Sequence, residues 1–442
     1  MNKICKLGIF TYFKYVFIEL AAIMILYIFG FIILCIILCF VYIRLKYKFW
    51  TLQPVFHFYD IYYWFINVGV IRKELPEKNR YVNLKKIITK RFEEIDELTL
   101  KELVLLIRLN YLRNGENIFS PTKENIVPYF VGHNTKTYWS YFVEPELLID
   151  NKIGKTIEEN LKIGIITSRP LHVKINNGRK DAIFDVYYVD YLCINKGWRK
   201  KNIAPQMIQT HEYNQSHDNR KICVSLFKRE EELTGIIPLT VYKTYCFNMK
   251  NWGHPEQLEH KINVLTGDKQ NMYYLYNFIN GLTKNELTKN EMTKNEITKN
   301  EMTNKWDIII YPEISNLIEL VTTKNLFIKM LVIDGNIEAV YIFRKTCTFI
   351  EKDKEILSCI ASVNGTNLNK NDFIKGFKSV LWSIIEEHRN FGYLVIEDIS
   401  DNTCIINNIC LRTHPLVVSP SAYFFYNFAY SPFKSEKCLI IN

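Results

Sequence analysis

The sequence lacks the cysteine and histidine spacings that bind zinc or build a disulfide framework. Its 11 cysteines are an odd number without a Cys-x-x-Cys pair, and its nine histidines include no His-Glu-x-x-His segment. His211 and His217 are six positions apart, which does not place them on one helical face. Scattered, unpaired cysteines are typical of a reducing compartment. We therefore expect neither a metal site nor a disulfide-stabilised fold.

Patterns that read nucleic-acid bases are also missing, although the chain is basic. The formal net charge is +10, and the lysines and arginines are spread along the sequence without an Arg-rich tail. This distribution favours a basic surface that suits small anionic ligands over nucleic-acid binding. With 442 residues, nearly half of them hydrophobic, the chain can form two ordinary domains.

Charge is absent from one long segment near the N-terminus. Leu20 to Ile43 contains no charged residue, and about 20 apolar residues suffice to span a bilayer as a helix. No small-residue cleavage site follows, and Arg44 comes directly after the segment. We expect an uncleaved membrane anchor, the alternative being a buried core helix. Lysines flank both ends, so charge does not fix the orientation. The free cysteines favour a catalytic part that faces the cytoplasm.

The remaining chain reads as mixed α/β structure. A helix is expected from Leu98 to Gly115, strands at 161–175 and 182–194, and a helix that opens at Pro205. In the second half, alternating apolar runs around Asp334-Gly335 predict a hairpin. A helix from Asp372 to Gly392 and a strand then follow, so that the two halves share one order of elements.

Residues 282–301 repeat a polar five-residue unit, LTKNE, with changes at its first position. The apolar residues of such a repeat form no stripe on a helix, which predicts a low-complexity insertion between two structured halves. The expected organisation is a tail and anchor at 1–43, a first half at 44–250, a connector at 251–306 and a second half at 307–442.

A basic loop joins the strand at 182–194 to the helix at Pro205. It contains Arg199, Lys200 and Lys201, and the backbone N–H groups around Asn202 to Ala204 lie at a helix start. Unpaired donors and the positive end of a helix dipole suit a phosphate group. The segment looks like the RxxGxG/A pyrophosphate loop of coenzyme A acyltransferases. Asn replaces the first glycine, and Asn tolerates left-handed backbone angles better than most residues.

Further segments carry a family resemblance through their common order along the chain. They are YKFWTLQPV at 47–55, NYLRNGENIFSPTKENIVPYF from Asn110, YLCINKGWRKKNIAP at 191–205, LTGIIPL from 233, DISDN at 398–402 and the terminal LIIN. Together they resemble the N-myristoyltransferase family (glycylpeptide N-tetradecanoyltransferase) over residues 47–442, with gaps.

The resemblance implies two pseudo-twofold-related, acetyltransferase-like halves in a monomer. The first half would bind myristoyl-CoA as co-substrate, with no further cofactor, and the second would bind much of a protein or peptide that begins with glycine. Asn364 and Asp398 match peptide-side positions. The residues that would contact the coenzyme are Tyr47, Lys48, Phe49, Trp50, Tyr191, Leu192, Cys193, Ile194, Arg199, Lys200, Lys201, Asn202, Ile203 and Ala204.

The implied chemistry is direct attack of the glycine amine on the thioester. The backbone amides of Tyr191 and Leu192 would form the oxyanion hole, and the C-terminal carboxylate of Asn442 would act as the base. Such aminolysis needs no metal and no covalent nucleophile. Cys193 is therefore interpreted as a buried strand cysteine. Without the resemblance, LIIN would be interpreted as a plain edge strand.

Three departures from the family keep alternatives open. Glu116 stands alone where the family has an acidic loop, Asn248 replaces a histidine, and the repeat replaces ordered structure. One alternative is another acyl-CoA N-acyltransferase of the same fold that uses a shorter acyl chain. The other is a non-catalytic, membrane-tethered protein that binds acyl-CoA and peptide.

Overall fold

The structure is a computed structural model that describes residues 2–112, 117–150, 155–176, 181–230, 235–282, 305–351 and 353–442. The chain divides into two units, Met1–Gln53 and Pro54–Asn442. Glu116 and residues 283–304, which hold nearly all of the repeat, lie outside the described residues.

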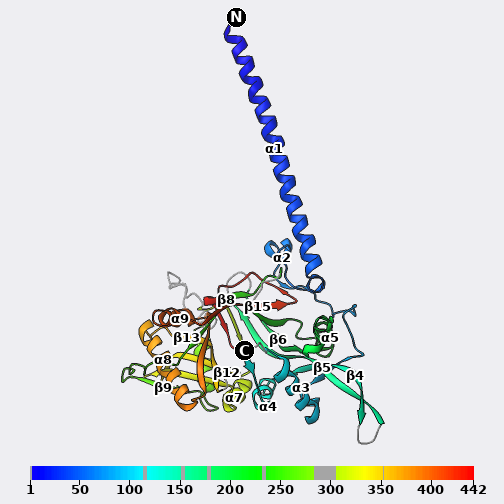
Figure 1. The fold of residues 1–442 in the computed structure, drawn as a ribbon. Helices are drawn as coiled ribbons and strands as arrows, with labels where there is room; N and C mark the ends of the chain where they lie inside the picture. The colour runs from blue at the N-terminus through cyan, green and yellow to red at the C-terminus, as the bar shows by residue number, and fades with distance from the viewer. Residues whose placement is uncertain are drawn as a thin grey trace, which may run out of the picture. The chain divides into compact units, whose positions relative to one another are not determined.

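The N-terminal unit consists of α1 (Asn2–Lys46), blue in Figure 1, and the short 3₁₀ helix η1 (Trp50–Leu52). Within the described residues, one stretch of helix, Leu20–Lys46, is long and apolar enough to cross a membrane by length and composition. Its apolar side chains are exposed, as Tyr27 (76%) illustrates, which argues against a buried core helix.

The second unit is built on one large mixed sheet. Across the described residues, 15 strands join it, in the order β17-β10-β5-β6-β7-β15-β8-β14-β13-β12-β11-β9, with β2, β3 and β4 branching from this path. The strands are β2 (Ile87–Arg91), β3 (Ile118–Phe119), β4 (Tyr138–Asp150), β5 (Lys155–Ile175), β6 (Ala182–Ile194), β7 (Ser225–Glu230), β8 (Thr240–Asn248), β9 (Ile262–Thr266), β10 (Ile308–Tyr311), β11 (Leu326–Ile333), β12 (Asn336–Glu351), β13 (Lys354–Asn364), β14 (Phe391–Glu397), β15 (Val417–Tyr426) and β17 (Cys438–Ile440). A separate pair joins β1 (Gly69–Val70) to β16 (Phe428–Ala429).

Helices pack against this sheet and at its ends. They are α2 (Ile61–Phe65), α3 (Glu97–Asn110), α4 (Lys123–Ile126), α5 (Ile203–Asp218), α6 (Met272–Gly281), α7 (Ile314–Thr322), α8 (Lys370–Glu387) and α9 (Asn402–Cys410), with the 3₁₀ helices η2 (Phe92–Glu94), η3 (Val127–Phe130), η4 (Lys196–Trp198) and η5 (Ser435–Lys437).

The two halves of the sheet repeat one topology. In the first half, β4, β5 and β6 form an antiparallel meander, α5 follows, and β7 returns parallel to β6. In the second half, β11, β12 and β13 form the meander, α8 follows, and β14 returns parallel to β13. The halves then exchange their last strands, because β8 pairs with β14 while β15 pairs with β7. The mixed α/β fold with two related halves is thus confirmed.

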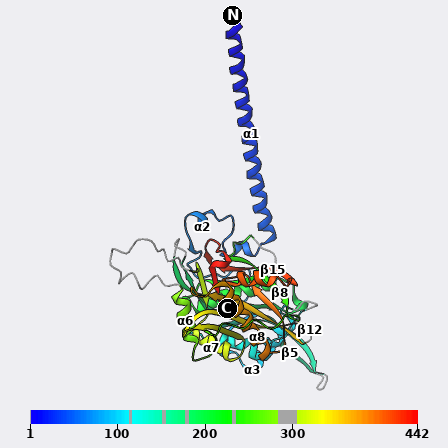
Figure 2. The same ribbon diagram turned by 90° about the vertical axis from the view of Figure 1, so that its left-hand side faces the viewer.

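The C-terminal strand lies inside this architecture. β17 pairs in parallel with β10, and β10 pairs with β5 of the first half. In both views of Figures 1 and 2 the C-terminus lies within the strands. A core cluster that includes Leu103, Tyr191, Leu439 and Ile441 extends across both halves. The last residue, Asn442, is only 2% exposed.

Several expected boundaries shift. The hairpin at Asp334-Gly335 is confirmed, with both residues at positive φ (50° and 81°). α3 ends at Asn110, before the expected glycine, because Tyr111 is already extended. α8 ends at Glu387, and the expectation that it continues to Gly392 was wrong. Gly392 lies in β14, where an added Cβ would stand only 2.9 Å from the Lys354 side chain.

Candidate active site

A β-bulge interrupts the pairing of β5 with β6. Asp190 pairs with Thr167 and Cys193 pairs with Ile165, so that Tyr191 and Leu192 together face a single residue of β5. Tyr191 has a φ of 46°, a left-handed conformation that is costly for an aromatic residue. Bulges disrupt the ladder locally, and strained residues of this kind concentrate at functional sites. The bulge falls on the two residues for which the sequence predicts oxyanion-binding amides.

One of those amides already donates a hydrogen bond to the carboxylate of Asp190. The Tyr191 N–H donates to Asp190 Oδ1 over 2.8 Å. Burial raises the pKa of Tyr111, Tyr188 and Tyr191, and the charge of Asp190 raises each further. Asp190 therefore lies among buried phenols. Sequence reasoning missed it, although a carboxylate one position before the predicted amides was a usable signal.

The C-terminus is held by Arg344. The Ile441 N–H donates to Ile310 O over 2.8 Å, and Arg344 Nη1 donates to Asn442 O over 3.4 Å. The side chain of Arg344 is 23% exposed, and its Nη2 lies 3.7 Å from Glu397 Oε1. The terminal residue thus contacts a guanidinium that is shared with a buried carboxylate.

Glu397 is fixed by its partners. Lys228 Nζ lies 3.1 Å from Glu397 Oε1, and the Tyr242 hydroxyl donates to Oε2 over 2.8 Å. Burial alone would raise the pKa of Glu397, but the nearby cations of Lys228 and Arg344 outweigh it and lower that pKa. An ionised carboxylate with this many partners is a poor proton acceptor.

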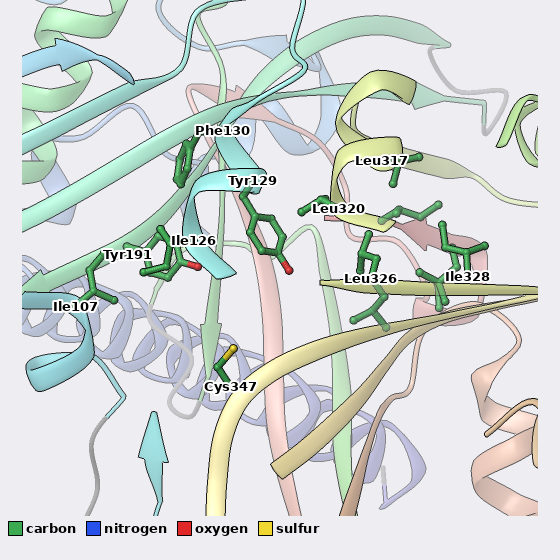
Figure 3. Close-up of a cluster of buried hydrophobic side chains, with 14 of the residues drawn as sticks. Ile107, Ile126, Tyr129, Phe130, Tyr191, Leu317, Leu320, Leu326, Ile328 and Cys347 are labelled. Atoms are coloured by element: carbon green, nitrogen blue, oxygen red, sulfur yellow. The ribbon is translucent and has the colours of Figure 1, made fainter. Parts of the chain in front are cut away.

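The bulge and the C-terminus share neighbours. Burial is the main cause that raises the pKa of Tyr188; Asp190 raises it further and Arg344 lowers it, so both charges are felt there. Burial also raises the pKa of Tyr129 to about 12, against the opposing charge of Arg344. Figure 3 shows Tyr129 among the side chains of Tyr191, Leu320 and Cys347, between the two halves. The buried guanidinium of Arg169 lies 5.1 Å from the ring centroids of Tyr129 and Tyr188.

Arg199 anchors the basic loop to the ends of β6 and α3. Its Nε donates to Ile194 O over 3.1 Å and its Nη2 donates to Asn110 O over 2.6 Å. The Asn110 side chain in turn accepts from the Lys196 N–H over 3.0 Å. Because these contacts hold the Arg199 guanidinium against the backbone, we expect Lys200 and Lys201 to be the side chains that contact a bound phosphate.

Lys200 and Lys201 are exposed, and the backbone beside them is shaped for close approach. Lys200 and Asn202 have φ values of 63° and 59°, so the left-handed conformation expected for Asn202 is present. The Lys201 ammonium lies 4.2 Å from the centroid of the Trp198 ring. α5 begins at Ile203, two residues before Pro205, and the Asn202 side chain does not cap it. The first amides of α5 therefore remain available to an anion.

The chain was compared with family models and with solved structures of known proteins. No known family model matches the sequence. Structures of Saccharomyces cerevisiae N-myristoyltransferase with bound myristoyl-CoA match 88% of this chain with a TM-score of 0.62, one at 13% identity over 94% of its own length and one at 14% over 90%. A third, with bound myristoyl-CoA and inhibitors, matches at 12% identity, a TM-score of 0.63, and 88% and 91% of the two chains. The chain has the N-myristoyltransferase fold.

Cys193 lies in β6 of this N-myristoyltransferase fold as a buried cysteine. It is 4% exposed, and burial raises the pKa of its thiol to about 12. A thiol in this state is not the thiolate that a nucleophile requires. Ile194, 9% exposed, ends the same strand and packs in the cluster with Ile203 and Met207 of α5. Among the described residues, no group of three or more His, Cys, Asp or Glu side chains could hold a metal ion.

The expected peptide-side residues are anchored separately. The Asn364 N–H donates to Asp401 Oδ2 over 2.7 Å, and Asp401 also pairs with Lys305 at 2.6 Å. Asp398 instead accepts from the Thr403 hydroxyl over 2.6 Å at the start of α9. The structure thus joins Asn364 to Asp401, three positions after Asp398.

The remaining expected coenzyme contacts belong to the N-terminal unit. Tyr47, Lys48 and Phe49 lie between the end of α1 and η1, and Trp50 begins η1. The rings of Phe49 and Trp50 meet edge to face, with 5.1 Å between centroids. Their contact with a coenzyme stays a prediction.

Proposed function

We propose that this chain transfers a myristoyl group from myristoyl-CoA to the N-terminal glycine amine of proteins, as a monomer. The observation that supports the proposal most directly is the bulge at Tyr191 and Leu192, which lies in β6 just before a basic loop and a helix start. The solved structures of this fold that bind myristoyl-CoA support the choice of co-substrate.

In this proposal the basic loop holds the coenzyme phosphates. Lys200 and Lys201 supply charge, and the amides at Asn202, Ile203 and Ala204 supply donors. The thioester oxygen then lies at the bulge, where the amides of Tyr191 and Leu192 stabilise the charge that develops on it. Cys193 and Ile194 border the acyl chain. The resemblance in sequence adds Tyr47 to Trp50 to the proposed contacts with the coenzyme.

The amine nitrogen forms a bond to the carbonyl carbon, and the bond from that carbon to sulfur breaks. The coenzyme leaves as a thiolate that takes up a proton. The amine loses its own proton to the C-terminal carboxylate of Asn442. This route needs neither a metal nor an acyl-enzyme. Asn364 and Asp398 help to hold the peptide.

We further propose that α1 anchors the protein in a membrane and that the catalytic part faces the cytoplasm. The composition of Leu20–Lys46 supports the anchor, and the many free cysteines support a reducing compartment.

The test uses the full chain, purified in detergent, with myristoyl-CoA and a peptide that begins with glycine. We expect a stable amide at the peptide N-terminus, identified by mass spectrometry. The matched control is the same peptide with an acetylated N-terminus, which should gain nothing. Faster transfer from a shorter acyl-CoA would favour the other N-acyltransferase of this fold.

A non-catalytic binding protein is the second candidate, and one contact favours it. The Asp190 carboxylate accepts from the Tyr191 N–H, so this donor is already engaged within the chain. Binding of both ligands without any amide product would establish this candidate over the transferase.

A further inference from the structure

Asp190 differs from the other carboxylates near the proposed reaction centre. Glu397 is paired with Lys228 and Arg344, and the terminal residue contacts Arg344. Asp190 is half-buried, and among the described residues no lysine, arginine or histidine forms an ion pair with it. Its side chain accepts a hydrogen bond from the N–H of the next residue. An ionised carboxylate offers about four lone-pair positions, so Asp190 retains capacity for another donor.

No described cation forms an ion pair with Asp190, although the guanidinium groups of Arg169 and Arg344 act on the same phenols. The phenols around Asp190 are weak partners for a full negative charge, because burial holds them in the protonated state. The substrate of the proposed reaction brings a cation, since an N-terminal amine with a pKa of about 7.7–8.0 is mostly protonated at neutral pH. An ammonium group adds the attraction between two full charges to a hydrogen bond with a carboxylate, so it competes well with a neutral backbone N–H.

We propose that Asp190 binds the α-ammonium group of the peptide substrate and, by turning towards it, releases the Tyr191 N–H for the thioester oxygen. This inference rests on the proposed function. Tyr191 directly follows Asp190 at the bulge, so one small side-chain movement frees the predicted donor. The oxyanion site is then complete only when an amine is present, which protects the thioester from attack by water.

Two protons leave the nitrogen in this sequence. The ammonium group gives the first to the C-terminal carboxylate, which passes it to solvent, and the neutral amine attacks the thioester carbonyl. The second proton leaves the nitrogen as the bond from carbon to sulfur breaks, and the coenzyme thiolate takes it up. The amide product carries no charge at that nitrogen. Asp190 therefore loses its cation after transfer and returns to the Tyr191 N–H.

The first test is Asp190→Asn in the full chain, read as peptide binding in the presence of a non-cleavable thioether analogue of myristoyl-CoA. Binding of a glycine peptide at pH 7 should weaken by about tenfold, as expected for loss of a charge-assisted hydrogen bond. Binding of the analogue should not change, which also shows that the variant folds. The loss should shrink as the pH rises from 7 to 9, because the neutral amine gains little from a carboxylate. Asp185→Asn, on the same strand but paired with His172, is the matched control and should bind like the wild type.

Two further readouts separate the outcomes. A peptide analogue with a hydroxyl in place of the ammonium group should bind the wild type about as weakly as the glycine peptide binds Asp190→Asn. Asp190→Ala should hydrolyse myristoyl-CoA faster than the wild type when no peptide is present. Equal, pH-independent peptide binding by the wild type and Asp190→Asn would overturn the inference. Asp190-dependent binding without any transfer by the wild type would leave it standing and overturn the proposed function.

Discussion

The terminal residue shows how one side chain positions a neighbouring group. Arg344 Nη1 donates a hydrogen bond to Asn442 O over 3.4 Å, which places a guanidinium beside the C-terminal carboxylate. Arg344 therefore holds the terminal residue in place, and in the proposed reaction its carboxylate is the proton acceptor. The Asn442 side chain does not enter this argument, because only the backbone carboxylate is involved.

Extension of the chain by one glycine after Asn442 should separate the carboxylate from the rest of the site. Turnover should fall by about 10²–10⁴-fold, the range for loss of a general base, while myristoyl-CoA binding persists. Asn442→Gln is the matched control and should stay active. Steady-state rates with a glycine peptide measure both, and full activity in the extended chain would exclude the carboxylate. Deletion of Leu439 to Asn442 is a less specific change, because Leu439 is fully buried in the core.

Individual residues differ in how far the sequence predicts them. Asn202 was predicted to take left-handed angles, since Asn tolerates them, and it does. The bulge at Tyr191 depends on the register between β5 and β6, which no local pattern specifies. Asp190 was missed although it directly precedes the predicted amides, because its contact with the Tyr191 N–H forms only in the bulged backbone.

At the scale of elements, the basic residues of the loop between β6 and α5 have two different environments. Arg199 bonds two backbone carbonyls and connects the loop to the end of α3. Lys200 and Lys201 are exposed, and the Lys201 ammonium lies over the Trp198 ring of the same loop. Gly164 of β5 lets α5 pack closely, since an added Cβ would stand 2.6 Å from Met207 Sδ. The start of α5 is thereby fixed beside the strand that carries the bulge.

Replacement of Lys200 and Lys201 by alanine should weaken acyl-CoA binding with little effect on stability. The loss should be largest at low salt, where the charges are least screened. Titration of the coenzyme at several ionic strengths measures the effect. Lys250 and Lys269, both exposed, give a double alanine variant with the same change in net charge, which should bind normally. Equal affinities at every ionic strength would refute the assignment.

Element ends were less predictable than element types. Strands at 182–194 and the helix near Pro205 follow from apolar runs and from proline placement, and both are present. The end of α3 at Asn110 depends on a distant residue, because Arg199 takes the Asn110 carbonyl. α8 ends at Glu387 because His388, with φ −133° and ψ 81°, has already left the helical conformation.

At the scale of the whole molecule, the halves are inseparable in the sheet. The exchange of β8 and β15 places the last strand of each half beside the other half, and the pairing of β17 with β10 brings the C-terminus to β5. The repeated order of strand, helix and strand was visible in the sequence. The exchange was not, because it depends on pairings between residues far apart in the chain.

The division of the chain after Gln53 separates the anchor from the unit that carries the bulge, the loop and the C-terminus. The predicted coenzyme contacts at Tyr47 to Trp50 lie within the N-terminal unit, so a truncation must retain them. A chain that starts at Arg44 removes the apolar run and keeps these residues. It should acylate a soluble glycine peptide at a rate close to that of the full chain in detergent, because the chemistry requires no residue before Tyr47. A chain that starts at Pro54 is the matched comparison and should lose affinity for myristoyl-CoA. Should the Arg44 chain bind myristoyl-CoA and still fail to transfer it, the anchor would be part of the reaction site and not only a tether to the membrane.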